Sequence, residues 1–369
     1  MNKPRTYATR LENCMTAGNN MKIDPVKNCP FNRENSPFAD VVLSSRARLA
    51  RNLDGFPFVN RASLSDCREV ASLVKHICDD IQEKEDLEWV NLDELDNLTT
   101  ELFVERHLVS STLAHASHPR AIAIGPELSR SVMINEEDHI RIQSLRPGLQ
   151  LEEARKDVDT LDLRIEEIIA YAFDEDLGFL TACPTNVGTG ARFSIMLHLP
   201  ALRIIKDLQL VRNACEGMSL AIRGYQGEGS KAIADLYQVS NQVTLGYTEE
   251  QLCSVIANDF LPSVIKWERE GRKTILENQF SKLEDQTHRS LGLLKNARML
   301  KLHEAMQCLG NIRLGVCTGL LENVDLPTIN KLFIEIHPSH LRWEFGRDIP
   351  DDKLASFRSE LIREKLQKC

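Results

Sequence analysis

Short runs of alternating apolar and polar residues fill the chain from Asp40 to about Gly246, and they limit the possible folds more than any other feature. A period of two is typical of β-strands with one buried face. Helical spacing recurs in the same region at Ser65 to about Glu85 and at Leu151 to about Phe173, and it dominates after Thr248. We therefore expect an α+β domain followed by a smaller all-helical domain. The strand-like runs are DVVLSSRARLA, RAIAIG, SVMI, GFLTACP, RFSIMLHL, SLAIRGY and YQVSNQVTLG.

The length of 369 residues also favours two domains, because it exceeds what a single hydrophobic core usually supports. Residues 1–38 are polar and aperiodic, and we expect them to form a mobile N-terminal extension. We assign residues 39–250 to the α+β domain and residues 251–369 to the helical domain. Within the helical part, Pro327 predicts the start of a helix.

Composition and charge argue against several classes of protein. A formal net charge of −9 argues against a broad surface for nucleic acid or for acidic membranes. No apolar run is long enough to span a bilayer, and the first twenty residues lack the apolar centre of a signal peptide. The ten cysteines include no C-x-x-C pair, so neither a zinc site nor a disulfide framework is indicated. We expect a reduced, cytoplasmic protein.

Two glycine-rich stretches are candidates for binding phosphate, but neither matches a nucleotide-binding motif. In GYQGEGSK the order Ser then Lys is the reverse of that in a Walker A loop. In NVGTGARFS, Gly188 and Gly190 have no third glycine at the spacing of a dinucleotide-binding loop. Both stretches can still bring backbone N–H groups close to an anion.

Three consecutive carboxylates interrupt the stretch SVMINEEDHIRIQ, Ser131 to Gln143. Alternation places Val132, Ile134, Ile140 and Ile142 on one face of the flanking runs, and Glu137 and Arg141 on the other. The polar face therefore carries a carboxylate and a guanidinium four positions apart. A hairpin with a merely solvated acidic turn explains this stretch equally well by itself.

Arginines recur beside the strand-like runs. Arg46 and Arg48 share one face of their run, and Arg141, Arg192 and Arg223 lie in three others. So many guanidinium groups at strand positions are costly to bury unless an anion neutralises them. A triphosphate would do so, because its oxygens match the planar guanidinium fork. The alternative is that each arginine is solvated or paired with a carboxylate, but their co-occurrence argues against it.

The motifs SSRARLARN, INEEDHIR, CPTNVGTGAR and AIRGYQGEG resemble, in order and spacing, those of the ATP:guanidino phosphotransferases, the phosphagen kinase superfamily. The intervals from Glu137 to Cys183, from Cys183 to Arg192 and from Arg223 to Glu228 are also similar to the family's. The resemblance covers most of the α+β domain. CPTNVGTGARFSIMLHLPAL, LYQVSNQVTLG and the helical C-terminal part look closest to the bacterial protein arginine kinases.

This resemblance implies a fold and a reaction. The fold would be an antiparallel β-sheet flanked by helices, the phosphagen kinase catalytic domain, followed by the smaller helical domain. The reaction would transfer the γ-phosphoryl group of MgATP to the guanidino group of arginine residues in proteins, marking those proteins for quality control or regulation. The implied cofactors are ATP and Mg²⁺, and the implied partners are arginine-containing protein substrates, with an activator protein and a homodimer as further candidates.

The resemblance also implies a role for each site residue. A protonated guanidinium is a poor nucleophile, so its attacking nitrogen must lose a proton as the bond to phosphorus forms. The base would be Glu137 and the second carboxylate clamp Glu228, with Cys183 as the family's reactive cysteine. Glu136 would help to order Mg²⁺ through water. The nucleotide ligands would be Arg46, Arg48, Arg141, Arg192, Arg223 and Ser44.

Two departures from the family's pattern bear on the substrate and on regulation. Metabolite kinases of the superfamily carry a helical domain before the SSRARLAR motif, whose loop closes over the free substrate; here the motif begins at Ser44, which favours an arginine on a protein surface. Protein arginine kinases carry an Arg-Asp pair that binds phosphoarginine, where this chain has Leu354 and Ala355 and keeps only Arg358. Two alternatives remain, a small-molecule guanidino (arginine) kinase and a catalytically silent adaptor that binds nucleotide or arginine-rich partners.

Overall fold

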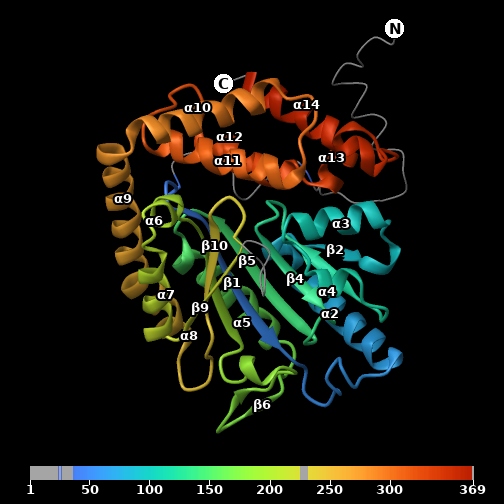
Figure 1. Ribbon diagram of the computed structural model, residues 1–369. Coiled ribbons are helices and arrows are strands. Elements are labelled where there is room, and N and C mark those ends of the chain that lie inside the picture. Colours follow the sequence, from blue (N-terminus) through green and yellow to red (C-terminus); the bar gives the residue numbers. More distant parts are fainter. Residues whose placement is uncertain (1–23, 25, 27–35, 225–231, 368–369) are drawn as a thin grey trace.

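The α+β expectation is confirmed by an eight-stranded antiparallel sheet with the strand order β2-β3-β4-β5-β1-β8-β10-β9 (Figure 1). The computed structural model describes residues 24, 26, 36–224 and 232–367, so nearly all of the expected N-terminal extension lies outside the described residues. The strands are β1 (Val42–Arg51), β2 (Glu88–Asn91), β3 (Ala121–Ile124), β4 (Arg130–Ile134), β5 (Ile140–Pro147), β8 (Ala191–His198), β9 (Leu220–Gly224) and β10 (Leu236–Asn241), and a separate hairpin pairs β6 (Phe173–Asp174) with β7 (Gly178–Phe179).

Helices cover one face of the central strands because the apolar side chains of those strands alternate toward that face. Ala47, Leu49, Ile142 and Phe193 form a single buried cluster there with helix α5 (Leu151–Glu166). At the β2–β4 end the opposite face is covered too, by a further buried cluster that includes Phe103, Ile122 and Met133. The other helices of this part are α2 (Leu64–Glu85), α3 (Asn97–Glu105), α4 (Ser111–Ala114), α6 (Pro200–Ile204), α7 (Leu208–Gly217) and α8 (Glu249–Ser254).

Two local expectations were wrong. The helix expected to reach about Phe173 ends at Glu166, because the chain turns so that Tyr171 can form a β-bridge with Leu53 and donate a hydrogen bond to Asp162. In GFLTACP only Gly178 and Phe179 are in a strand, and the rest is a loop. The helix start signalled by Pro327 is confirmed in α12 (Leu326–Glu335).

The C-terminal part is helical, as expected. Helix α9 (Leu261–Asn278) runs beside α6, and the helices after it lie as a layer across one end of the sheet (Figure 1). Its core is a second buried apolar cluster, to which the sheet contributes Leu43 and Leu236. Helix α9 packs against α6 and its Glu268 accepts hydrogen bonds from the N–H groups of Ala201 and Leu202. The expected domain boundaries at residues 38 and 250 remain predictions. The helices are α9 (Leu261–Asn278), α10 (Phe280–Asn296), α11 (Leu302–Cys317), α12, α13 (Pro338–Phe345) and α14 (Leu354–Gln367).

The structure bears on two arguments made from composition, one about membrane spans and one about disulfides. Within residues 36–224 and 232–367, no helix is both long and apolar enough to cross a membrane. The seven cysteines that lie in the described part of the chain are all free of disulfides.

Candidate active site

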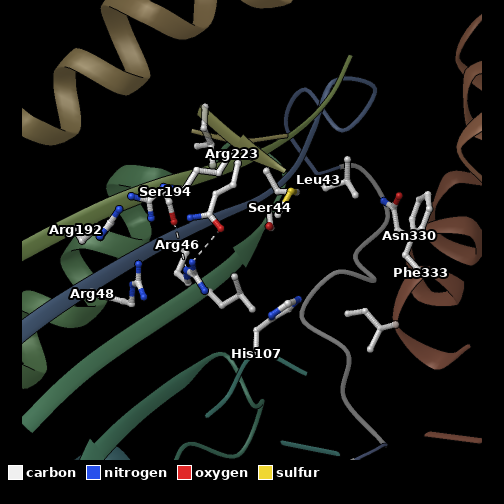
Figure 2. A pocket seen from close by; sticks show the side chains of 15 residues that line it. Leu43, Ser44, Arg46, Arg48, His107, Arg192, Ser194, Arg223, Asn330 and Phe333 are labelled. Carbon is white, nitrogen blue, oxygen red and sulfur yellow. Dashed lines mark hydrogen bonds between the residues drawn. The ribbon is translucent and has the colours of Figure 1, made fainter. Parts of the chain in front are cut away.

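The face of the sheet opposite the apolar cluster carries the arginines. Strand pairing sets Arg48 of β1 directly opposite Arg192 of β8, and Arg46 opposite Ser194. Arg141 on β5 is opposite Ala50, one diagonal step from Arg48. Figure 2 shows the Arg46, Arg48 and Arg192 side chains on the same side of the sheet. Antiparallel pairing thus gathers, on one surface, guanidinium groups from segments nearly 150 residues apart.

The guanidinium groups on this arginine face repel one another. Burial, together with the charges of Arg141 and Arg192, lowers the pKa of Arg46 to about 10. Burial likewise holds the pKa of Arg48 well below its usual range, and the surrounding arginines add to this, while Glu136 opposes it. The guanidinium of Arg46 donates to Ser194 Oγ and Gln238 Oε1, each at 3.3 Å. Both acceptors are neutral, so they satisfy hydrogen bonds of Arg46 without balancing its positive charge. The arginine face therefore favours an anionic ligand.

Two adjoining cavities open over the arginine face. One, of about 300 Å³, is lined by Ser44, Arg192 and Arg223 among others. The second, of about 490 Å³, is lined by Arg141 and Gln143. Both are lined by Arg46, Arg48 and His107, so the arginines form a continuous cationic floor.

The acidic triplet lies in the turn of the β4–β5 hairpin, but the turn is not merely solvated, because Glu136 and Asp138 are buried. Glu136 is buried, and its carboxylate accepts hydrogen bonds from Ser110 Oγ at 2.7 Å and from the Glu137 N–H at 2.9 Å. It also forms an ion pair with Arg141, with Nη1 and Oε2 2.5 Å apart. Burial raises the pKa of Glu136, but Arg141, Ser110 and the Glu137 N–H outweigh it, so the pKa lies below its usual value.

Glu137 is the exposed member of the triplet and borders the arginine face. Its Oε2 lies 3.6 Å from Nη2 of Arg141, and 43% of its side chain is accessible to solvent. Partial burial raises the pKa of Glu137; Arg141 and a hydrogen bond from Cys183 oppose the rise, and the charges of Asp138 and Glu136 support it. A carboxylate with a raised pKa is a stronger base, as proton abstraction requires.

A hydrogen-bond network holds the acidic turn against the loop that carries Cys183. Asp138 Oδ1 accepts from Asn52 Nδ2 and from the Ala182 N–H, both at 2.7 Å. The Cys183 thiol is partly exposed and lies 3.0 Å from Thr185 Oγ1, so this cysteine is not a buried packing residue. The network brings Cys183 to Glu137, although 46 positions separate them in the sequence.

Comparison with known proteins agrees with this geometry. The model of the ATP:guanido phosphotransferase C-terminal catalytic domain matches residues 69–271. The chain belongs to the ATP:guanido phosphotransferase family. A second model, the protein-arginine kinase McsB C-terminal domain, matches residues 280–369.

Relatives of this phosphotransferase match it over nearly their whole length. A protein of Halothermothrix orenii named protein-arginine kinase is 40% identical over 332 residues, which cover 89% of this chain and 94% of that protein. A protein of the same name from Clostridium novyi is 39% identical, with coverage of 90% and 97%. Among solved structures, a lombricine kinase aligns with a TM-score of 0.56 at 23% identity, covering 67% of this chain and 70% of that one, and it shows the fold alone.

The described part of this phosphotransferase brings most of the expected site residues together, but not all of them can be placed. Glu228 lies outside the described residues, five positions after Arg223 in the sequence. Ser44 and Arg223 line the smaller cavity, as nucleotide ligands would. The roles assigned to these residues remain predictions.

Three residues of the site were missed by the sequence analysis: His107, Ser194 and Gln238. Ser194 and Gln238 could have been found, because alternation along RFSIMLHL and YQVSNQ puts them on the same face as Arg192 and next to the arginines. His107 gave no such signal. It follows α3 in a left-handed conformation, with φ of 59°, and reaches the sheet only through the tertiary fold.

Magnesium has no direct set of protein ligands in this part of the chain. No three His, Cys, Asp or Glu side chains gather to hold a metal ion among the described residues. Both oxygens of Glu136 already accept hydrogen bonds or bind Arg141. These contacts do not suit direct coordination by Glu136, and its expected contact with Mg²⁺ through water remains a prediction.

Proposed function

We propose that this chain is a protein arginine kinase, which transfers the γ-phosphoryl group of ATP to the guanidino group of arginine residues in proteins. The observation that carries the proposal is the crowded arginine face that ends at Glu137 and Cys183. Relatives named protein-arginine kinase, similar over at least 94% of their length, support protein arginine as the acceptor.

The arginine face would bind the nucleotide through its phosphates. The charge of Arg192 lowers the pKa of both Arg46 and Arg48, so an anion that binds between these residues removes a repulsion present in the free protein. Phosphoryl transfer depends mainly on positioning and on stabilising charge on the transferred group. Fixed guanidinium forks on adjacent strands supply both.

The acceptor guanidinium would bind at the Glu137 end of the face. One Glu137 oxygen accepts a hydrogen bond from an N–H of the substrate's guanidinium. This contact turns the attacking nitrogen toward the phosphoryl group. As the P–N bond forms and the bond to the leaving nucleotide oxygen breaks, the proton of that nitrogen passes to Glu137. Arg141, paired with Glu136, stays beside Glu137 and stabilises its ionised form before the reaction. Glu228 is proposed as the second clamp.

Mg²⁺ would reach the site with the nucleotide, since it keeps much of its water and binds phosphate oxygens readily. When bound it would neutralise part of the phosphate charge. Glu136 would not coordinate the ion directly, because both of its oxygens are already engaged.

The decisive experiment compares two acceptors. We expect kcat/KM to be at least about tenfold higher for an unstructured arginine-containing protein than for free arginine at equal arginine concentration, because remote contacts offset the cost of orientation. Mass spectrometry without acid, which would cleave the P–N bond, identifies the product. Equal or higher values for free arginine would favour the small-molecule kinase, and no transfer with bound nucleotide would favour the silent adaptor.

The proposal also covers the role of the phosphorylated product, the partners and the location of the protein. Phosphorylated arginine would mark client proteins for quality control or regulation. An activator protein, a homodimer and a cytoplasmic location are predictions. A phosphoarginine-binding pocket is not proposed, since Leu354 is buried and Arg358 donates to the carbonyls of Ile336 and Leu300 at 2.7 and 2.9 Å.

A further inference from the structure

The smaller cavity is closed on one side by the helical C-terminal part. Its floor is the arginine face of the sheet, and Asn330, Phe333 and Ile334 of α12 line it on the other side. Figure 2 shows Arg48 and Arg192 at one end of this space and Asn330 and Phe333 at the other. The sheet and the C-terminal helices therefore meet around one cavity.

Polarity changes along the cavity. The end at Arg48 and Arg192 is cationic, whereas the end at α12 is lined by apolar side chains. A ligand with an anionic chain at one end and a flat, largely apolar ring at the other matches this change. The apolar side chains that line the cavity are Leu43, Leu145, Ile195, Met196, Phe333 and Ile334.

We propose that α12 is the wall against which the purine base of the nucleotide packs, so that the helical C-terminal part contributes to nucleotide affinity and selectivity. The proposal rests on the proposed function, which places the phosphates on the arginine face. Helix α12 lies outside residues 69–271, which match the ATP:guanido phosphotransferase model, and inside residues 280–369, which match the second model. The base contact would thus be supplied by a part of the chain beyond the catalytic-domain match.

A helix cap, apolar packing and a buried hydrogen bond hold α12 in a defined position. Asp325 caps α12 by accepting from the Thr328 N–H at 2.7 Å. Ile329 and Phe333 anchor the helix in the second apolar cluster. Asn330 Oδ1 accepts from Nε of the fully buried Arg313 at 3.1 Å, which fixes the amide at the edge of the cavity, where its polar atoms suit the polar edge of a base.

Ile334 is the most informative position on this wall. It is only 4% exposed, yet it belongs to none of the apolar clusters among the described residues, and it lines the cavity. Its side chain therefore borders the space in which a ligand would bind. Ile329, one and a half turns earlier, is equally apolar and fully buried in the second cluster, away from the cavity lining.

The experiment measures binding of two probes, ADP and inorganic tripolyphosphate, by titration calorimetry on the full chain. In Ile334→Ala we expect the Kd for ADP to rise about tenfold, because apolar contact with the base is lost, and the Kd for tripolyphosphate to stay within twofold. In the control Ile329→Ala both values stay within twofold. Ile334→Val, a smaller truncation, is expected to raise the Kd for ADP two- to threefold and serves if the alanine variant does not fold.

Three outcomes would overturn the proposal. ADP binding by the Ile334 variants equal to that of the parent would remove α12 from the base site. Equal weakening of ADP and tripolyphosphate would point to general damage of the arginine face. Failure of the parent to bind ADP at all would contradict the proposed function itself, and so is distinct from the first two results.

Discussion

Three adjacent carboxylates show how strongly the surroundings of a residue decide its chemistry. Glu136 is paired with Arg141, and its pKa is lowered, so it stays ionised. Glu137 is exposed next to the arginine face, and its pKa is raised. Asp138 is buried, which raises its pKa in spite of hydrogen bonds from Ala182 and Asn52. Only Glu137 combines access to a ligand with increased basicity, which makes it the best candidate for the base.

Glu137→Gln should lower kcat at least about a hundredfold while the Kd for ADP stays within a few-fold, because the amide keeps the shape of the side chain but cannot accept the proton. Kinetic assays with a protein substrate and calorimetry with ADP give the two numbers. The exposed Glu277 on α9 provides the matched control, since Glu277→Gln should change neither. Turnover within a few-fold of the parent would remove Glu137 from this role.

The pH dependence of kcat/KM should report the same group. Glu137 must be deprotonated to act as the base, so activity should rise with pH through its pKa. Since burial raises that pKa above the ordinary value of 4.5, the acidic limb of the profile should be centred above pH 4.5. The pH profile of the residual activity of Glu137→Gln should lack this acidic limb. A midpoint at or below pH 4.5 would contradict the assignment.

Arg192→Lys tests whether the arginine face acts by geometry or by charge alone. A lysine keeps the positive charge but loses the planar fork that Arg192 places opposite Arg48. We expect kcat to fall at least about tenfold, with a change of less than threefold in the KM for ATP. Arg289→Lys, at an exposed position on α10, is the control. An effect confined to KM would indicate that Arg192 binds ground state and transition state equally.

At the scale of elements, the loop before β8 determines where Arg192 lies. Gly190 has φ of +63°, and a Cβ atom there would lie 2.5 Å from the Ala50 carbonyl oxygen of β1. Gly188 has φ of +110°, and a Cβ atom would lie 2.8 Å from Leu245. Glycine at these positions lets the loop pass close to β1 and enter β8 in register with it. The two glycines thus act by close approach of the backbone.

Gly190→Ala should lower the free energy of unfolding by about 2 kcal/mol or more, because the left-handed φ and the close carbonyl both oppose a methyl group. Urea denaturation measures the change. Gly217→Ala is the matched control: it lies at the end of α7, with no atom within 4 Å of its would-be Cβ. That change should be neutral or stabilise by up to about 1 kcal/mol. Equal effects of the two substitutions would contradict the close approach.

At the scale of the whole molecule, polar contacts tie the C-terminal helices to the sheet domain. Glu105, the last residue of α3, accepts hydrogen bonds from the N–H groups of Ser339 and His340 and lies 2.8 Å from His340 Nδ1. At the other end of the interface, Arg313 of α11 donates to the Asp40 carbonyl at 3.1 Å and to Nδ1 of His198 at 2.8 Å. The two parts are therefore joined by two separate sets of polar contacts.

Acid should weaken this interface. Burial lowers the pKa of His107 to about 3 and lowers those of His198, His337 and His340. The unfolded chain binds protons at these groups near pH 6.5, and the folded chain does not, so the free energy of unfolding should fall as the pH drops below about 6.5. Denaturation in urea at pH 7.5 and pH 5.5 should show a loss of at least about 2 kcal/mol.

His198→Asn should reduce that loss by about 1 kcal/mol, because its amide oxygen can still accept a hydrogen bond from Arg313 but cannot titrate. His303→Asn, at an exposed position on α11, should leave the loss unchanged. A stability that does not depend on pH between 7.5 and 5.5 would contradict neutral, buried histidines.

The sequence by itself determined those features that depend on local periodicity or on contiguous motifs. Alternation identified β1 and β8 and put Arg46, Arg48 and Arg192 on the polar side of their strands. Four motifs in their order and spacing, with the one around Glu137 among them, indicated guanidino phosphotransfer. Physical reasoning works here because the side-chain direction in a strand follows from its period of two, and needs no knowledge of distant residues.

Only the tertiary structure decided which distant groups meet. It paired Glu136 with Arg141, brought Cys183 to Glu137, placed His107 over the sheet and closed the cavity with Ile334 of α12. None of these contacts leaves a local signal, because each depends on strand order and on the docking of two apolar cores. The early end of α5 has the same origin, since the tertiary contacts of Tyr171 outweighed the helical spacing that continues past Glu166.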